Sequence, residues 1–478
     1  MKKGEIIENL KIESMAAEGR CVARHDGRVV FVEGVAPGDV VHVRVYRVKR
    51  NYAEAALVKL VEPAAIRTAP FCRHFGFCGG CVWQHISYEV QLQYKQQQVI
   101  DSLERIAGVS LPGIRPIIGS AAIRHYRNRL DFTATHRRWL SAEEFRQMDG
   151  KTEITPGPGL GFHVPKRFDQ VFDVEHCWLM PEPCNAIRLA VKEIALQHGI
   201  PFFDLRNQTG YLRTVTVRTT TTGEVMVIIQ VAHHHQEWLS LLMNGLAERF
   251  PQITSLIFGV NTKRNNTFLD VELRLWKGSP WITEVMNRPE GGGQLQFRIS
   301  PRSFYQTNPK QAETLYKTAW QMSALTGNEL VYDLYTGTGT IACYVASGAR
   351  RVVGLEYVEE AVEDARVNAR LNNINHAEFY SGDIKDLLSQ AFTEQHGNPD
   401  VVITDPPRTG MHPDVCGMLL RVAPKRIVYV SCNPATQARD IKMLSESYRV
   451  SAVQPVDMFP HTAHVENVVC LEKRSTQP

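Results

Sequence analysis

The first sixty residues alternate between apolar and polar positions over short stretches. The segment RVVFVEGVAPGDVVHVRVYRVKRNYAEAALVKLV shows this pattern, with glycines between the apolar runs. Alternation with a period of two is typical of strands that bury one face, and glycine favours the tight turns between them. The sequence therefore predicts four or five strands between Ile6 and Glu62, closed into a small β-barrel.

One predicted strand of this barrel is rich in cations. The run VHVRVYRVKR and the residues after it contain Arg44, Arg47, Lys49 and Arg50 beside Tyr46 and Tyr52. Such residues are typical of a solvated strand face. They also suit an OB-like RNA-binding module, in which cations contact phosphates and aromatic rings stack on bases. Both interpretations stay open from this strand alone, and Arg44 and Arg47 are the predicted RNA contacts.

The pattern changes twice after the barrel. Pro63 to Pro70 has the composition of a linker, and the helical stretch YEVQLQYKQQQVIDSLERIAG ends at a glycine. From about residue 120 to 285, strand-like runs such as TVTVRT and EVMVIIQVA surround the helical segment NAIRLAVKEIALQHG, which predicts an α+β domain with antiparallel pairing. After about residue 295, strand, loop and helix repeat in turn, which is typical of a doubly wound, Rossmann-like α/β sheet.

Length and composition agree with several globular domains. The chain has 478 residues, and about 150 residues per domain gives about three domains. Hydrophobic residues make up 44% and charged residues 22%, so cores can form. The sequence has neither a run of about 18 apolar residues nor a signal-peptide pattern, so we expect a cytoplasmic chain without membrane contact. A net charge of +4 neither requires nor excludes a polyanionic partner.

A glycine loop follows one strand of the C-terminal part. In DLYTGTGT, Asp333 ends an apolar strand, and Gly337 and Gly339 allow a tight turn before a helix whose N–H groups suit a nucleotide-like ligand. The sequence lacks the G-x-G-x-x-G spacing of dinucleotide sites and the Walker lysine. Glu356 and Asp383 follow the next two strands, where carboxylates suit ribose hydroxyls and an adenine amine. This order of acidic strand ends resembles class I S-adenosylmethionine methyltransferases.

Two further residues suit covalent chemistry. RIVYVSCNP places Cys432 directly after an apolar strand, where a cysteine is usually buried and unreactive. The break at NP would instead present the thiol at the sheet edge where ligands of such folds bind. DPPRTG places Asp405 and Arg408 one strand earlier, and HTAHVE offers Glu466 as a general base. The sequence therefore predicts a nucleophile and a base at one edge of the sheet.

These motifs together resemble one enzyme family. FYQTNP, DLYTGTGT, DPPRTG, SCNP and HTAHVE resemble the RNA uracil-C5 methyltransferases, and the cysteine spacing plus the N-terminal barrel resembles their 23S ribosomal RNA branch. The resemblance covers nearly the whole chain. It implies a TRAM domain over residues 1–62, a central domain with an iron-sulfur cluster over residues 63–290, and a methyltransferase domain over residues 291–478.

The resemblance also implies roles for single residues. Cys432 would add to C6 of uracil, and Glu466 would remove the C5 proton, because C5 takes a methyl group only after a thiolate at C6 has pushed electron density onto it. The implied contacts to S-adenosylmethionine are Gln306, Tyr335, Thr340, Glu356, Asp383 and Asp405, although Thr340 stands where relatives often have asparagine. Arg408 would help to hold the RNA base. The implied substrate is 23S ribosomal RNA, without an obligate protein partner; a transfer RNA enzyme acting on the T loop shares these motifs and is the nearest alternative.

Three cysteines lie close together in FCRHFGFCGGCVWQH. Cys72, Cys78 and Cys81 have the spacing C-x5-C-x2-C. Four thiolates suit either a zinc ion or a 4Fe-4S cluster, and ligand chemistry alone does not separate the two. The C-x3-C-x2-C spacing of radical S-adenosylmethionine enzymes is missing. The family resemblance implies a 4Fe-4S cluster, with Cys177 rather than Cys184 as the fourth ligand.

A second set of cations follows in IRHYRNRLDFTATHRRWL. Arg127 and Arg129 in this segment are predicted to contact RNA, and a solvated strand face is the alternative. A noncatalytic iron-sulfur protein that binds RNA would explain the first half of the chain only. A methyltransferase explains the motifs of both halves.

Overall fold

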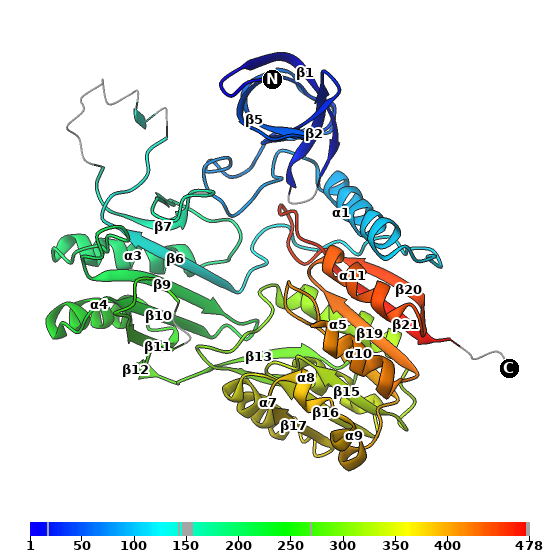
Figure 1. The fold of residues 1–478 in the computed structure, drawn as a ribbon. Helices are drawn as coiled ribbons and strands as arrows, with labels where there is room; N and C mark the ends of the chain where they lie inside the picture. Colours follow the sequence, from blue (N-terminus) through cyan, green and yellow to red (C-terminus); the bar gives the residue numbers. More distant parts are fainter. Residues whose placement is uncertain (17–18, 142–143, 146–155, 268–269, 475–478) are drawn as a thin grey trace.

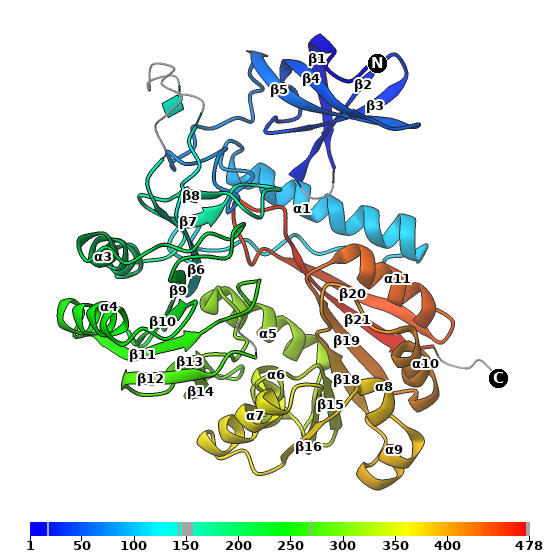
Figure 2. The ribbon, with the colours of Figure 1, turned by 60° about the vertical axis from the view of Figure 1, so that its left-hand side comes forward.

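The computed structural model describes the chain except for residues 17–18, 142–143, 146–155, 268–269 and 475–478. Figure 1 shows the N-terminal barrel at the top, a central sheet at the left and a C-terminal sheet at the right, and Figure 2 gives the same arrangement after a 60° turn. The barrel and the doubly wound C-terminal sheet predicted from the sequence are thus confirmed. No helix in the described ranges is long and apolar enough to cross a membrane.

Five strands close the barrel in the order β1-β2-β3-β5-β4. They are β1 (Ile6–Met15), β2 (Cys21–His25), β3 (Arg28–Glu33), β4 (Val40–Val48) and β5 (Tyr52–Glu62). In β4, Val43 and Val45 are buried in the barrel core, whereas Arg44 and Arg47 are exposed. The alternation seen in the sequence therefore sorts this strand into an apolar inner face and a cationic outer face.

The central sheet has seven strands in the order β12-β11-β10-β9-β6-β7-β8. The strands are β6 (Arg129–Thr135), β7 (Gly159–His163), β8 (Val171–Asp173), β9 (Leu212–Thr219), β10 (Val225–Val231), β11 (Ile253–Val260) and β12 (Leu273–Gly278), and the helices are α3 (Cys184–Gln197) and α4 (Gln236–Arg249). Pairing is antiparallel, as predicted, except between β10 and β11, which are parallel. A parallel pair needs a crossover, and α4 supplies it.

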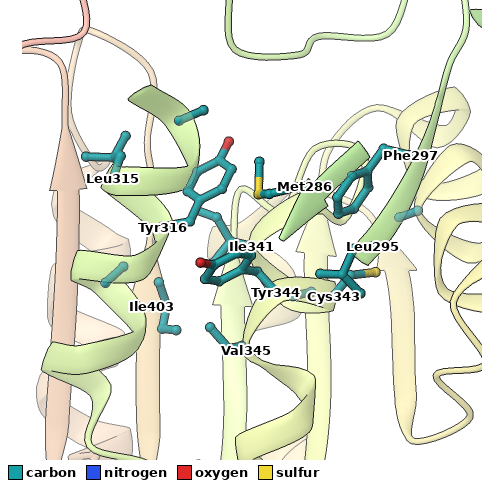
Figure 3. Packing of buried hydrophobic residues seen from close by; sticks show 14 of the residues in the cluster. Met286, Leu295, Phe297, Leu315, Tyr316, Ile341, Cys343, Tyr344, Val345 and Ile403 are labelled. Atoms are coloured by element: carbon teal, nitrogen blue, oxygen red, sulfur yellow. The ribbon is translucent and has the colours of Figure 1, made fainter. Parts of the chain in front are cut away.

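A hairpin connects the central sheet to the C-terminal body. It consists of β13 (Ile282–Asn287) and β14 (Gln294–Ile299), so the predicted domain boundary at residues 290 and 291 falls in its turn. Figure 3 shows Met286, Leu295 and Phe297 of the hairpin beside Tyr344 in the core of the C-terminal body. By its packing the whole hairpin is part of the C-terminal body.

The C-terminal sheet has the order β17-β16-β15-β18-β19-β21-β20, with β21 antiparallel to both of its neighbours. Its strands are β15 (Leu330–Leu334), β16 (Arg351–Glu356), β17 (Ala377–Ser381), β18 (Val401–Thr404), β19 (Arg426–Ser431), β20 (Tyr448–Val456) and β21 (Glu466–Lys473). The helices around it are α5 (Pro309–Ser323), α6 (Thr340–Val345), α7 (Glu359–Leu371), α8 (Ile384–Leu387), α9 (Gln390–His396), α10 (Pro413–Val422) and α11 (Pro434–Leu444), with the 3-10 turn η3 (Ala346–Gly348). Helices cover both faces, so the strands are almost wholly apolar.

Helix α1 (Tyr88–Ser102) and the π-helical turn η2 (Leu103–Ala107) also pack on the C-terminal body. The sequence assigned this segment to the central domain, between residues 63 and 290. Val99 and Leu103 instead form one apolar face against α11, and Ile114 bridges to the edge strand β20. The apolar face decides the placement, because it needs the second layer that α11 provides.

Candidate active site

The three predicted acidic residues lie together at one edge of the C-terminal sheet. Asp333 is in β15, Glu356 ends β16, and Asp383 follows β17 and caps α8. These strands are parallel neighbours, so their carboxyl ends share an edge. The loop after β15 turns sharply at Gly339, which has φ 75°, and a Cβ there would lie 2.8 Å from the Cβ of Ala365. Glycine is required because α6 begins this close to α7.

Hydrogen bonds hold the two outer carboxylates at this edge. The carboxylate of Glu356 accepts the backbone N–H of Gly337 at 3.0 Å and that of Tyr357 at 2.9 Å. Asp383 accepts the backbone N–H of Lys385 at 3.2 Å and pairs with its ammonium group at 3.0 Å. These interactions lower the pKa of Asp383. Asp383 is therefore an anionic acceptor at neutral pH, and backbone N–H groups hold the Glu356 carboxylate in place, in keeping with the hydroxyl and amine partners expected for the two residues.

Asp333 lies beneath the glycine loop and is fully buried. Its Oδ2 accepts the backbone N–H of Ala342 at 3.1 Å and the hydroxyl of Thr336 at 2.5 Å, and so ties the loop to α6. Burial raises the pKa of Asp333 to about 7. Thr340, also buried, begins α6, and its hydroxyl oxygen lies 3.3 Å from that of Thr338. Asp333 thus stabilises the loop through hydrogen bonds from its buried side. Tyr335 lies within the loop, is half-buried and has a φ of 62°.

Gln306 lies in the segment between β14 and α5 and is buried. The side chain of Asn128, from the central domain, donates to the carbonyl of Gln306 at 3.2 Å, and the Asn128 backbone N–H donates to the carbonyl of Thr307 at 2.8 Å. The side chain of Gln306 also hydrogen-bonds the hydroxyl of Tyr316 in α5. The central domain therefore helps to fix a residue that the sequence predicts in the cofactor site.

Cys432 and Glu466 come from adjacent antiparallel strands. In the ladder between β19 and β21, Ser431 pairs with Asn467. Cys432 is the next residue after β19, and Glu466 is the first residue of β21, so the same register brings them opposite each other. Opposed residues of an antiparallel pair have their side chains on the same face of the sheet. The fold thus unites a thiol and a carboxylate that are far apart in the sequence.

Burial and negative charge set the protonation of this pair. Glu466 is only 4% exposed, and burial, followed by the charge of the nearby Asp405, raises the pKa of Glu466. Burial also raises the pKa of Asp405. Burial, followed by the charge of Glu466, raises the pKa of the Cys432 thiol to about 11, whereas the guanidinium of Arg408 acts in the opposite direction. Arg408 is therefore the cation that favours a thiolate in this site.

Two residues that the sequence did not single out belong to the same site. Burial, followed by the charges of Asp405, Asp333 and Glu466, raises the pKa of Tyr316 in α5, so its hydroxyl lies near the carboxylates of this site. His464 lies at the surface, and its ring nitrogens are 3.3 and 3.4 Å from Nη2 of Arg408. The motif HTAHVE contains His464, but only the folded loop shows that it meets the arginine of DPPRTG.

The loop before Glu466 is fixed from two other parts of the chain. Lys95 of α1 and Asp457 are both fully buried and form an ion pair at 2.6 Å. The backbone N–H groups of Val82 and Trp83, directly after Cys81, donate to the carbonyl of His461 at 2.8 and 3.1 Å. Helix α1 and the cysteine segment therefore both position the predicted base.

Comparison with known proteins gives the terminal domains their family. Residues 274–474 match the family described as tRNA (Uracil-5-)-methyltransferase, and residues 3–58 match the TRAM domain. An uncharacterized RNA methyltransferase of Bacteroides thetaiotaomicron is 52% identical over 463 residues, which cover 96% of this chain and 100% of the relative. One of Porphyromonas gingivalis is 51% identical over 470 residues, with 98% and 100% covered. The chain belongs to the RNA uracil-5 methyltransferase family.

A solved structure agrees with this assignment. The Pyrococcus abyssi tRNA (uracil-54, C5)-methyltransferase in complex with S-adenosyl-L-homocysteine is 28% identical, with a TM-score of 0.72. The match covers 97% of this chain and 100% of that chain, so the likeness includes the barrel, the central body and the C-terminal sheet. The chain is therefore an S-adenosylmethionine-dependent RNA methyltransferase, as the motifs predict.

The methyltransferase brings its four predicted metal-binding cysteines around one cavity. Cys72, Cys78, Cys81 and Cys177 line a space of about 250 Å³ between the linker segment and the central sheet, whereas Cys184 is buried nearby in α3 and is not part of the lining. The backbone N–H of Gly80 donates to the sulfur of Cys78 at 3.4 Å. Burial raises the pKa of Cys78 and of Cys81 to about 12. Among the described residues, no three or more His, Cys, Asp or Glu side chains are arranged to hold a metal ion.

The predicted RNA-contacting arginines lie in three separate places. Arg44 and Arg47 are exposed on β4 of the barrel, and Arg47 also pairs with Glu54 at 3.5 Å. Arg127 and Arg129 both line the cavity of the four cysteines. Only Arg408, which is exposed, adjoins the predicted nucleophile and base.

Proposed function

We propose that this methyltransferase methylates C5 of a specific uridine in 23S ribosomal RNA, with Cys432 as the nucleophile and Glu466 as the base. The observation that supports this most strongly is the opposed placement of the two side chains at the end of β19 and the start of β21. A pyrimidine ring held between them would meet the thiol at C6 and the carboxylate near C5. The proposed substrate assigns the reaction to the cytoplasm.

The chemistry needs both residues in a fixed order. S-adenosylmethionine supplies the methyl group. The Cys432 thiolate forms a bond to C6, and the electrons of the C5–C6 double bond move toward the O4 carbonyl as an enolate, which makes C5 nucleophilic. Once C5 carries the methyl group, the Glu466 carboxylate takes the remaining C5 proton, and the C5–H electrons re-form the double bond as the C6–S bond breaks. Arg408 assists the first step, because its positive charge favours the thiolate.

The proposed cofactor residues surround the edge next to this pair. Glu356 and Asp383 would accept the ribose hydroxyls and the adenine amine, because both are fixed carboxylates at parallel strand ends. Gln306, Tyr335 and Thr340 would line the remainder of the crevice. Asp405 follows β18, between the cofactor side of the sheet and Cys432. The sheet thus places a methyl donor and a uracil at neighbouring strand ends.

The RNA must present its target base outside the stack. C5 and C6 of a paired, stacked uracil are inaccessible to a buried thiol and carboxylate, so the uridine has to be splayed out or already unpaired. In this proposal Arg408 contacts the RNA beside the reacting base, and Arg44 and Arg47 contact phosphates at the barrel. Arg127 and Arg129 would contact RNA near the cysteine cavity.

The four cysteines fit a 4Fe-4S cluster in this proposal. Around a zinc ion four thiolates would all lie at about 2.3 Å from one centre, whereas in a cubane cluster each thiolate binds its own iron and the sulfurs stand farther apart. The four thiols line one cavity, which supports a shared ligand, and the family resemblance favours the cluster over zinc. Cys72, Cys78, Cys81 and Cys177 would hold the cluster, and it would join the linker segment to the central domain.

A transfer RNA substrate is the second candidate. It is favoured by the Pyrococcus abyssi enzyme, a tRNA (uracil-54, C5)-methyltransferase that matches nearly the whole chain. Against it stands the cysteine spacing, which resembles the ribosomal RNA branch of the family, whereas the barrel does not discriminate, because the match to the Pyrococcus abyssi enzyme includes it. The two candidates share the reaction and differ only in the RNA.

Methyl transfer to both RNAs decides between them. The purified protein is incubated with methyl-labelled S-adenosylmethionine and with 23S ribosomal RNA or transfer RNA from cells that lack the gene. We expect label in 23S ribosomal RNA, and mass mapping should find it as 5-methyluridine. Label confined to transfer RNA would establish the second candidate, and label in neither RNA would refute both.

A further inference from the structure

A second hollow, here called the distal hollow, lies in the central domain and has a volume of about 980 Å³. Phe203 and residues 205–210 of one loop, the residues after β10 and β11, and Phe168 line it, whereas Asp204 of the same loop is buried outside the lining. Arg213, near the start of β9, also lines the hollow, whereas Arg218 near the other end of β9 donates to the carbonyls of Ser300 and Ser303, shortly before Gln306. Arg213 and Arg218 are five positions apart on β9, and five residues of an extended strand span about 17 Å. The distal hollow is therefore well separated from the catalytic crevice.

The lining of the distal hollow is cationic. Arg206, Arg213 and Arg264 line it, and its lining among the described residues contains neither aspartate nor glutamate. Arg206 is neutralised by an ion pair with Asp169 just outside the lining. Arg264 is exposed at the rim. The distal hollow therefore carries an excess of positive charge.

Arg213 adds a buried charge beneath this surface. Its side chain is 1% exposed and donates to the carbonyls of Asn261, Lys263 and Asn265 and to the side chain of Asn266, all of them neutral acceptors. Burial lowers the pKa of Arg213 only to about 10, so the group stays charged at neutral pH. A buried cation that is hydrogen-bonded but not neutralised by a carboxylate makes the hollow attractive to anions.

An aromatic ring stands beside these cations. Phe168, in the loop between β7 and β8, is 75% exposed. A ring this exposed gains little from packing in the protein alone. Exposed aromatic rings next to arginines are the combination by which proteins hold unpaired nucleotides, because the rings stack on bases and the cations meet the phosphates.

We propose that the distal hollow binds an unpaired segment of the substrate RNA, remote from the methylated uridine, with Phe168 stacked on a base and Arg264 against a phosphate. This proposal rests on the proposed function only in taking RNA as the substrate. The site adds affinity and not chemistry, because it is the other end of β9 that contacts the segment before Gln306. It also gives the enzyme a requirement for RNA longer than the target loop itself.

Steady-state methylation by the full-length protein tests the proposal. The substrate is unmodified 23S ribosomal RNA, or transfer RNA if that is the RNA that the wild-type protein methylates. Arg264→Glu should raise KM about tenfold and make the salt dependence of binding shallower, by about one or two in log–log slope. Phe168→Ala should raise KM about fivefold without a change of slope, because the substitution removes a ring and leaves every charge in place. For both variants kcat should stay within twofold of wild type.

Arg421→Glu, an equal change of charge at an exposed position of α10, is the matched control and should leave KM and slope unaltered. A photoreactive benzophenone amino acid in place of Phe168 should cross-link to the RNA, at a nucleotide other than the target.

Wild-type KM and slope in both variants would overturn the proposal, and cross-linking to a protein instead would assign the hollow to an acidic protein partner. A fall in kcat would also overturn it. If the wild-type protein methylates neither RNA, the proposed function fails, and that failure is distinct from the others.

Discussion

Cys432 and Glu466 oppose each other one residue beyond the last backbone pair of the β19–β21 ladder. Their relative position is therefore set by strand register and not by a flexible loop. Glu466 is nearly fully buried, and its charge is one of the causes that raise the pKa of the Cys432 thiol. The pKa of the thiol is about 11 even with Arg408 in place, so the thiol is protonated at neutral pH, and Arg408 is the cation that lowers this pKa.

Arg408 should control the pH at which the nucleophile becomes active. The pKa of the Cys432 thiol is raised to about 11 by burial first and by Glu466 second, and Arg408 lowers it. The rate of covalent adduct formation at saturating RNA should therefore rise with pH between about 6 and 9. Arg408→Gln removes a charge that favours the thiolate, so the rise should move to higher pH by about one unit, and the rate near pH 7 should fall about tenfold. A stopped-flow or quench series across this pH range measures both. An unshifted profile in Arg408→Gln, with Arg421→Gln as the control, would remove Arg408 from this role.

The buried ion pair between Lys95 and Asp457 should matter for stability. Both side chains are fully buried, and Lys95 also donates to the carbonyl of Phe459 at 3.0 Å. Lys95→Met leaves the carboxylate of Asp457 buried without its cation, and it should lower the free energy of unfolding by about 3–5 kcal/mol. Denaturant titration measures this. Lys317→Met, at an exposed position of α5, should change stability by no more than about 0.5 kcal/mol. A decrease below about 1 kcal/mol in Lys95→Met would show that the pair does not hold α1 to the loop.

The cysteine cavity makes a prediction about metal content. Anaerobically purified protein should contain iron and acid-labile sulfide and be brown. Cys81→Ser should lose both, because every thiolate binds a separate iron. Cys184→Ser should keep them, since Cys184 is buried in α3 outside the cavity lining. Elemental analysis that finds stoichiometric zinc and no iron in the wild-type protein would rule out the cluster.

The outer face of β4 should contribute affinity for RNA and no chemistry. Arg44 and Arg47 are exposed there, on the strand whose valines fill the barrel. Replacing both by alanine should weaken binding about tenfold at low salt and make the salt dependence shallower by about one for each phosphate that an arginine no longer neutralises. Filter binding at several salt concentrations measures this, and kcat at saturating RNA should not change. Unaltered affinity and slope would leave the strand as a solvated face.

Residues at the strand ends could be predicted from the sequence because their position follows from local patterns. An apolar run that ends in Asp333 or Glu356 places the acid at the carboxyl edge of a parallel sheet, whatever the rest of the chain does. Cys432 is a similar case, since it directly follows the apolar run of β19. These residues are found together in the structure as expected, and their contacts to S-adenosylmethionine remain predictions.

Contacts between distant segments could not be predicted in the same way. Lys95 occurs in a polar-looking helix, and only its partner Asp457, 362 residues away, explains its burial. Arg127 and Arg129 resemble a solvated cationic face in the sequence, but the packing of the linker on the central sheet turns both toward the cysteines. Such positions depend on how separate bodies dock, for which periodicity carries no information.

The order of events at Cys432 and Glu466 is the central claim, and a trapped adduct tests it most directly. The protein is incubated with substrate RNA and methyl-labelled S-adenosylmethionine and run on a denaturing gel. Glu466→Gln should add Cys432 to C6 and place the methyl group on C5, but it cannot remove the C5 proton, so a slow-migrating protein–RNA band carrying the label should accumulate. Cys432→Ala should show neither turnover nor this band. Near-normal turnover in Glu466→Gln, or an adduct in Cys432→Ala, would contradict the account.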